Sequence, residues 1–204
     1  MAAQEPDRSS GVVEAIFTAP EGKAEMHPHE RVELHAGKGI PGDRYYTGTG
    51  TYWKPGDEGQ ELTLIEAETL DALREEGIEL DPSETRRNVL TRGIDLNALV
   101  GREFRIGTAR AVGRELAEPC RHLERLTGKP VMRPLVHRGG LRADLLTSGE
   151  VAVGERIVAE GRADSQIVHR IVRRILIHGD FLDDDVFLLL QLFLREHGLE
   201  KHIR

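Results

Sequence analysis

The chain has 204 residues, and its 35 acidic side chains outnumber its 28 Lys and Arg, which gives a formal net charge of -7. A negative net charge argues against proteins that bind nucleic acid or acidic membranes through a general basic field, so we expect neither partner. The single cysteine, Cys120, excludes an intrachain disulfide and any metal site built from several thiolates of this chain.

Residues 1–10 form a polar stretch that lacks the apolar core of a secretory signal, and we expect a flexible N-terminus there. Residues 11–160 consist of short β-branched or alternating runs separated by Gly, Pro and Asp, which predicts one domain, a barrel or sandwich of many short strands. The expected strands are Gly11–Thr18, Arg31–His35, Leu62–Ile65, Asn88–Thr91, Glu103–Ile106, Ala109–Leu116, Arg142–Leu146 and Glu150–Val158.

Two helices and one long loop interrupt these strands. The first helix, Glu66–Glu76, has an apolar face and ends before a glycine, whereas the second, Pro119–Leu126, is shorter and has Pro119 at its first position. The segment Ala36–Gln60 holds seven glycines, all three tyrosines and the single tryptophan of the chain. A loop of that length in a compact domain is usually functional or mobile.

Residues 161–204 change to helical patterning and predict a C-terminal extension with helices at Asp164–His178 and Asp183–His197. The middle of the second helix is apolar nearly all round, so we expect it to pack on the barrel or on another subunit, as in a homodimer. The longest apolar run, Val186–Leu194, is far shorter than the roughly 20 residues that a membrane span needs. These features predict a cytoplasmic protein with no membrane partner.

Cys120 is the first candidate for chemistry. The Pro119-Cys120 pair would place the thiol in the first turn of a helix, where unpaired backbone N–H groups favour the thiolate. His122 and His137 are candidate neighbours. The alternative is a buried cysteine that acts as a small hydrophobe.

Charged residues near glycines form the second group of candidates. Asp43 next to Arg44 offers either a structural ion pair or an anion-binding guanidinium. Arginines near strand ends would suit a phosphorylated ligand if they converge on one mouth of a barrel, and the alternative is solvated surface charge. These arginines are Arg86, Arg87, Arg92, Arg133, Arg138 and Arg142.

Other motifs are weak or missing. His27 and His29 could face the same way on a strand and bind zinc, but Pro28 disturbs the strand and no further ligand stands at the right spacing. The sequence contains no Walker phosphate loop, no G-x-S-x-G and no H-E-x-x-H, so most large enzyme classes lose support.

Taken in order, several short blocks resemble the MOSC domain, which is found at the C-terminus of molybdenum cofactor sulfurases and in stand-alone bacterial proteins. The sequence departs from that pattern at Tyr45, where many members have His, and at Glu155, where many have Asp. The blocks are Gly37-x-Gly39-x-x-Gly42-Asp43-Arg44, Arg86-Arg87-Asn88-Val89, Gly101-x-x-Phe104, Glu118-Pro119-Cys120, Arg138-Gly139-Gly140-Leu141 and Gly149-x-Val151-x-x-Gly154.

The resemblance implies a mainly β fold, a closed or partly open β-barrel with short helices, that binds the molybdenum cofactor (molybdopterin). Cys120 would be the catalytic residue, either as a molybdenum ligand or as a sulfur carrier. The larger sulfurases also carry a pyridoxal-phosphate domain, but this chain is too short to include it, so we do not expect pyridoxal phosphate here. The implied cofactor-binding residues are Asp43, Arg44, Arg87, Asn88, His122, Arg138 and Arg142.

The leading hypothesis is therefore a molybdenum-cofactor-binding and sulfur-carrier protein. It would support cofactor sulfuration or the reduction of N-hydroxylated compounds, with a cysteine desulfurase or a reductase acting in trans. A sulfurtransferase and an oxidoreductase component both remain open. The alternative is a non-catalytic interaction module that dimerises or binds a partner through its C-terminal helices.

Overall fold

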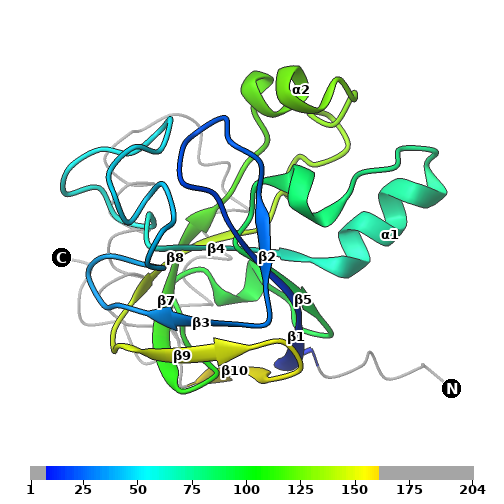
Figure 1. Ribbon diagram of the computed structural model, residues 1–204. Helices are drawn as coiled ribbons and strands as arrows, with labels where there is room; N and C mark the ends of the chain where they lie inside the picture. Colours follow the sequence, from blue (N-terminus) through cyan, green and yellow to red (C-terminus); the bar gives the residue numbers. More distant parts are fainter. Residues whose placement is uncertain (1–7, 161–204) are drawn as a thin grey trace, which may run out of the picture. The chain divides into compact units, whose positions relative to one another are not determined.

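The computed structural model describes residues 8–160 of the chain (Figure 1). The expected C-terminal helices, the homodimer built on them and residues 1–7 of the expected flexible N-terminus lie outside the described residues. The first strand, β1, already begins at Ser10. No helix in the described part is long and apolar enough to cross a membrane.

Ten strands, two α-helices and two short 3-10 helices make up the described chain. The helices are α1 (Ala67–Glu75) and α2 (Arg121–Thr127), and the 3-10 helices are η1 (Pro82–Thr85) and η2 (Asn97–Leu99). The strands are β1 (Ser10–Thr18), β2 (His27–His29), β3 (Arg31–Leu34), β4 (Leu62–Glu66), β5 (Val89–Arg92), β6 (Glu103–Ile106), β7 (Ala109–Leu116), β8 (Leu141–Leu145), β9 (Gly149–Ala152) and β10 (Arg156–Glu160).

Seven of these strands close into a barrel. Their order is β10-β6-β7-β8-β4-β5-β1, and β1 pairs back onto β10. β2 extends the sheet beside the end of β1, and β3 pairs separately with β9. The barrel confirms the prediction of a mainly β fold with short helices.

Two strand predictions need correction. The expected single strand Glu150–Val158 is wrong, because the chain turns at Gly154, which has a φ of 87°, and divides there into β9 and β10. β2 was not expected, because it contains Pro28. The strand pairs only with the end of β1, and such an edge tolerates a proline without a ladder N–H.

The second helix begins two residues later than expected. Cys120 has extended backbone angles, φ -140° and ψ 160°, and stands at the N-cap, so neither it nor Pro119 belongs to the first turn of α2. The carbonyl of Cys120 accepts a hydrogen bond from the Leu123 N–H at 3.0 Å. Gly128 ends the helix in the left-handed conformation, as expected from its position.

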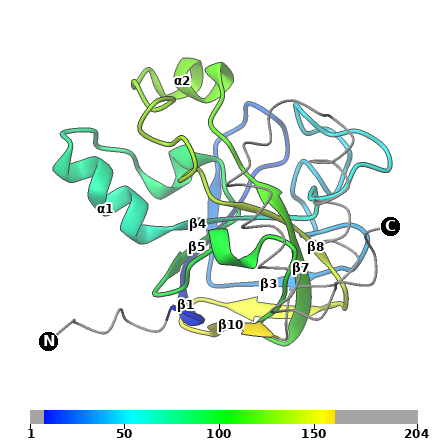
Figure 2. The same cartoon turned by 180° about the vertical axis from the view of Figure 1, so that it is seen from behind.

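Two apolar clusters stabilise this arrangement. Alternating residues point to opposite faces of each strand, so Leu64 of β4 and Val89 of β5 lie in the barrel interior, while Ile65 and Leu90 face outward. The outward cluster is covered by both helices (Figure 2). The residues of α1 and α2 in it are Ala67, Leu70, Leu73 and Leu123.

Strand register brings distant segments together at one end of the barrel. Leu116, the last residue of β7, pairs with Leu141 of β8, and Leu141 also pairs with Leu64 of β4. Leu64 in turn pairs with Val89, the first residue of β5. The segment that follows β7 and the segment that precedes β5 therefore meet at the same end, where α2 also lies (Figures 1 and 2).

Candidate functional site

A cavity of about 230 Å³ lies at this end of the barrel. Its lining includes the only cysteine of the chain together with four arginines, and the wall between them carries tyrosines, threonines and one carboxylate. The lining residues are Gly22, Arg44, Tyr45, Thr51, Tyr52, Thr63, Arg86, Arg87, Ala117, Glu118, Cys120, His122, Leu123 and Arg142.

Cys120 presents a partly exposed thiol to this cavity. The Tyr52 hydroxyl donates a hydrogen bond to its Sγ at 3.4 Å. Burial alone would raise the pKa of the thiol, but the Tyr52 hydroxyl, the N–H groups of Leu123 and His122 and the charge of Arg87 together lower it. The site therefore favours the thiolate, as expected for Cys120, although the residue is a cap rather than part of the helix.

Two of the cavity arginines bind backbone carbonyls instead of carboxylates. Arg87 donates to the carbonyls of Gly139 at 2.8 Å and Ala117 at 2.6 Å, and Arg86 donates to the carbonyls of Ala24 and Gly22. No carboxylate within residues 8–160 forms an ion pair with either guanidinium. Both positive charges are therefore available to an anion in the cavity.

The guanidiniums of Arg86 and Arg87 lie close to other positively charged side chains of the site. Burial and then the neighbouring charges of Arg142 and Arg44 lower the pKa of Arg87 to about 10. For Arg86, burial and the charge of Arg44 lower the pKa to about 10. Both guanidiniums remain cationic at neutral pH. A bound anion would offset the repulsion between the positive charges that line the cavity. Arg142 adds a further positive charge, with only a 3.7 Å contact to the exposed carboxylate of Glu115.

Asp43 and Asn88 lie beneath the cavity and organise its wall. The Asp43 carboxylate accepts hydrogen bonds from Arg44 Nη1 and Asn88 Nδ2, both at 3.1 Å, and from the N–H groups of Ala19 and Tyr45. Asp43 and Asn88 are buried and do not line the cavity, whereas Arg44 does. Asp43 and Arg44 thus form a buried ion pair, and the hydrogen bonds from Asn88 Nδ2 to Asp43 and from Arg44 Nη2 to the Arg86 carbonyl hold the loop after β3 against the segment before β5.

The remaining arginines are dispersed. Arg138 binds the Pro134 carbonyl and the Glu76 carboxylate and does not line the cavity. Arg92 pairs with Glu14 and Asp71 on the outside of the barrel. The structure therefore brings Arg44, Arg87, His122 and Arg142 to the same cavity as Cys120, while Asp43 and Asn88 support it from behind.

Nine of the lining residues were not among the predicted site residues, and they include Arg86, Tyr45 and Tyr52. Arg86 is one of the arginines near strand ends, and Tyr45 is a departure from the family pattern, but only the composition of its loop marks Tyr52. Tyr52 also stacks edge-on against His122, with ring centroids 6.1 Å apart.

Glu118 lines the cavity, and its carboxylate contacts the backbone N–H of His137 at 3.0 Å and the ring Nδ1 of His137 at 2.8 Å.

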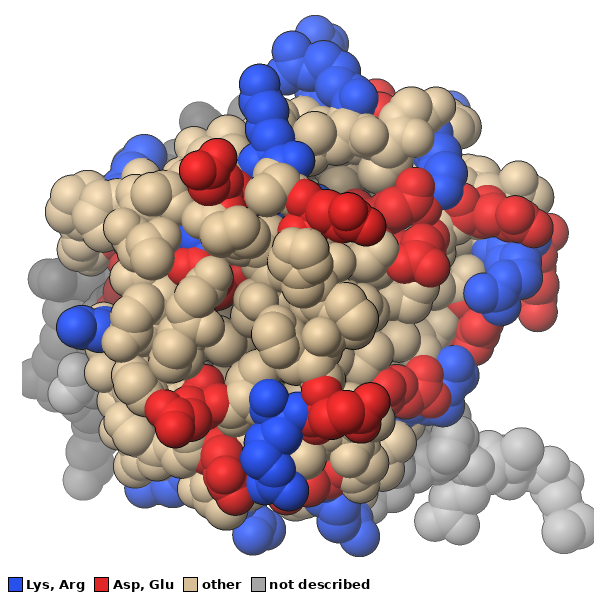
Figure 3. Space-filling view, viewed as in Figure 1, with Lys and Arg blue, Asp and Glu red and all other residues tan. Residues whose placement is uncertain are grey.

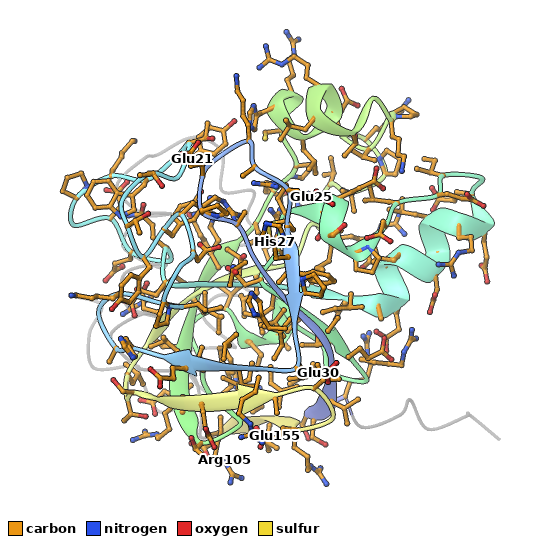
Figure 4. The ribbon with its side chains drawn as sticks, viewed as in Figure 1. Glu21, Glu25, His27, Glu30, Arg105 and Glu155 are labelled. Atoms are coloured by element: carbon orange, nitrogen blue, oxygen red, sulfur yellow. The ribbon has the colours of Figure 1, made fainter. Side chains whose placement is uncertain are left out.

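The histidine pair of β2 does not form part of this cavity. His29 Nε2 contacts the Thr18 hydroxyl at 2.7 Å, and His27 is exposed on the same strand, with Glu25 and Glu30 near either end of it (Figure 4). Between residues 8 and 160, no three His, Cys, Asp or Glu side chains gather in a way that could hold a metal ion.

Known structures share this fold. YuaD from Bacillus subtilis superposes with a TM-score of 0.62 at 18% identity, covering 75% of this chain and 97% of its own. YiiM from Geobacillus stearothermophilus gives 0.61 at 15% identity, covering 89% and 97%, and YiiM from Escherichia coli gives 0.55 at 19% identity, covering 88% and 84%.

The sequence itself matches a family model. No curated protein matches the chain. The model of the MOSC domain, however, matches residues 37–158, a segment that runs from the loop before β4 to β10 and includes Cys120. This match spans more than half of the chain, which therefore belongs to the MOSC domain family.

Proposed function

We propose that this chain binds the molybdenum cofactor in the cavity and that Cys120 is either a ligand of molybdenum or a carrier of sulfur. The observation that carries the proposal is the position of the Cys120 thiol in the same cavity as the Arg86 and Arg87 guanidiniums, which have no carboxylate partner in the described chain. Membership of the MOSC family supports the same cofactor.

The residues present suit the chemistry of this group. Molybdenum accepts soft thiolate ligands, and the pKa of Cys120 is lowered despite its burial. The cofactor also carries a terminal phosphate, which planar guanidiniums bind through paired hydrogen bonds. Arg86, Arg87 and Arg142 would hold that phosphate, and Arg44 would complete the wall behind it.

When bound, the cofactor would supply a redox-active metal that takes up soft sulfur ligands. The protein would contribute a preformed anion site and a thiol whose pKa is lowered by its surroundings. Cofactor sulfuration and reduction of N-hydroxylated compounds both remain open as outcomes. A cysteine desulfurase would donate sulfur in trans for the first, and a reductase would donate electrons for the second.

Several related assignments also remain proposals. We expect the protein to act in the cytoplasm, without nucleic acid, membrane or pyridoxal phosphate. Arg138 is left out of the cofactor site because its guanidinium is engaged elsewhere. The alternative of a non-catalytic interaction module depends on residues 161–204, outside the described part of the chain.

The test is the molybdenum content per chain after gel filtration, for wild type and Cys120→Ala, each incubated with molybdenum cofactor released from a donor enzyme. Near-stoichiometric metal in the wild type that is lost in a folded Cys120→Ala would support thiolate ligation. Metal retained in both would assign Cys120 to sulfur transfer. Absence of metal from both would contradict cofactor binding.

A further inference from the structure

Tyr45 has a fixed ring in the wall of the cavity. Its N–H donates to Asp43 Oδ1 at 3.0 Å, and the guanidinium carbon of Arg44 lies 5.1 Å from the ring centroid. Gly50 packs so closely on the ring that a Cβ added there would meet ring atoms at 3.0 Å. The first contact fixes the backbone of Tyr45, and the other two hold its ring between Arg44 and Gly50, which leaves the ring little freedom to turn away from the cavity.

The hydroxyl of Tyr45 differs from those of the other two tyrosines. Tyr46 Oη contacts His35 Nδ1 at 3.1 Å, and Tyr52 Oη donates to Cys120. No residue of the described chain forms a hydrogen bond with Tyr45 Oη, although the side chain is largely buried and lines the cavity. A polar group in such a place needs a partner, which water or a ligand must supply.

The surroundings of Tyr45 favour an anionic partner. Tyr45 lines the same cavity as Arg86 and Arg87, and an ionised Tyr45 would raise the pKa of both guanidiniums, against the effect of burial. The phenol therefore lies within electrostatic range of the two guanidiniums that lack carboxylate partners. An oxygen held by Arg86 and Arg87 would accept a hydrogen bond from a phenol in this position.

We propose that Tyr45 is a further binding residue of this site and that its hydroxyl donates a hydrogen bond to the anionic group held by Arg86 and Arg87. The inference rests on the proposed function, since it assigns the hydroxyl to the phosphate of the same cofactor. Histidine at this place would present an N–H donor instead of the O–H donor of tyrosine.

The experiment compares wild type, Tyr45→Phe, Tyr45→His and Tyr46→Phe in the full chain. Tyr45→Phe removes one oxygen and keeps the ring against Arg44 and Gly50, so we expect an unchanged melting temperature. The probes are inorganic phosphate, measured by calorimetry, and molybdenum cofactor released from a donor enzyme. Tyr46→Phe is the matched control, because it removes a hydroxyl from the adjacent residue, which does not line the cavity.

We expect Tyr45→Phe to weaken phosphate affinity by about ten- to 150-fold, the range for losing one hydrogen bond to a charged group. Tyr46→Phe should bind as wild type does, and Tyr45→His should regain part of the loss. Equal affinity in wild type and Tyr45→Phe would overturn this inference and leave the proposed function standing. An equal loss in Tyr46→Phe would also overturn it, because the effect would then belong to the loop as a whole. If the wild type binds neither phosphate nor cofactor, the proposed function fails as well.

Discussion

Burial and hydrogen bonding act in opposite directions on the thiol of Cys120. Burial raises its pKa, while the Tyr52 hydroxyl is the largest of the influences that lower it. The same hydrogen bond is the largest of the influences that raise the pKa of Tyr52. The phenol of Tyr52 therefore stays protonated and can donate to Cys120. The reactivity of Cys120 thus depends on a residue 68 positions away in the sequence.

The first prediction concerns Tyr52→Phe. Because thiolate is the form that reacts, the alkylation rate of wild type with iodoacetamide should rise with pH around a midpoint below the ordinary thiol pKa. Loss of the Tyr52 donor should move that midpoint upward and slow alkylation at neutral pH. Cys120 is the only cysteine, so the measured signal comes from one atom.

Tyr46→Phe is again the control, and it should leave the alkylation profile unchanged. If Tyr52→Phe has the same midpoint as wild type, the hydroxyl does not stabilise the thiolate. A general loosening of the fold would instead affect both variants and would also lower their melting temperatures.

At the scale of elements, local patterns predict most strands and the first helix. Ala109–Leu116 is predicted with the observed bounds, because the run follows Gly107 and begins with alternating apolar and charged residues, Ala109, Arg110 and Ala111. Glu150–Val158 is predicted as one strand, because its residues favour β structure on both sides of Gly154. The division there follows from pairing with different partners, β3 and β6, which no local pattern contains.

The site is less visible in the sequence than the fold. The motif blocks contain Cys120 and Arg87, and Arg142 directly follows the block Arg138-Gly139-Gly140-Leu141, so these residues can be singled out from the sequence. Tyr45 and Tyr52 lie in an irregular loop, so only the tertiary structure shows that they face the same cavity as Cys120. The motif blocks also do not separate residues that touch a ligand from residues, such as Asp43, that hold the wall.

Gly140 shows how an element boundary supports the site. It has a φ of 101°, and a Cβ added there would lie 1.9 Å from the carbonyl oxygen of Leu64 in β4. Its own carbonyl accepts from the Ala117 N–H at 2.7 Å, and the preceding carbonyl of Gly139 accepts from Arg87. The start of β8 is therefore tied both to the segment that leads to Cys120 and to the arginine before β5.

The second prediction is that Gly140→Ala destabilises the protein by about 2–5 kcal/mol, the sum of left-handed strain and overpacking. Gly128→Ala is the matched control, because its φ of 67° is also positive but an added Cβ would meet nothing within 4 Å. That variant should lose only about 1–2 kcal/mol. Urea unfolding of both variants measures the difference, and equal losses would show that the close contact with Leu64 relaxes without cost.

At the scale of the whole molecule, charge is distributed unevenly. The chain carries a net charge of -7, yet basic side chains project from the end where α2 lies (Figure 3). Lys23, Arg121 and Arg125 are exposed there, and within the described chain none of them forms an ion pair. Burial and then the charges of Arg125 and Lys23 lower the pKa of His122, which lines the cavity, so these two cations lie close to its mouth.

The third prediction is that these cations guide the anionic cofactor to the cavity. Changing both Arg121→Glu and Arg125→Glu should slow cofactor association about tenfold at low salt, within the range known for electrostatic steering. The matched control carries Lys38→Glu and Arg156→Glu, which change the net charge by the same amount. Both residues are exposed cations that form no ion pair in the described chain and do not line the cavity. Stopped-flow measurements should show a difference between the two variants that shrinks as salt shortens the Debye length from about 30 Å at 0.01 M to about 3 Å at 1 M. Equal slowing in both variants would assign the effect to net charge, and the basic residues of α2 would then have no special part in cofactor capture.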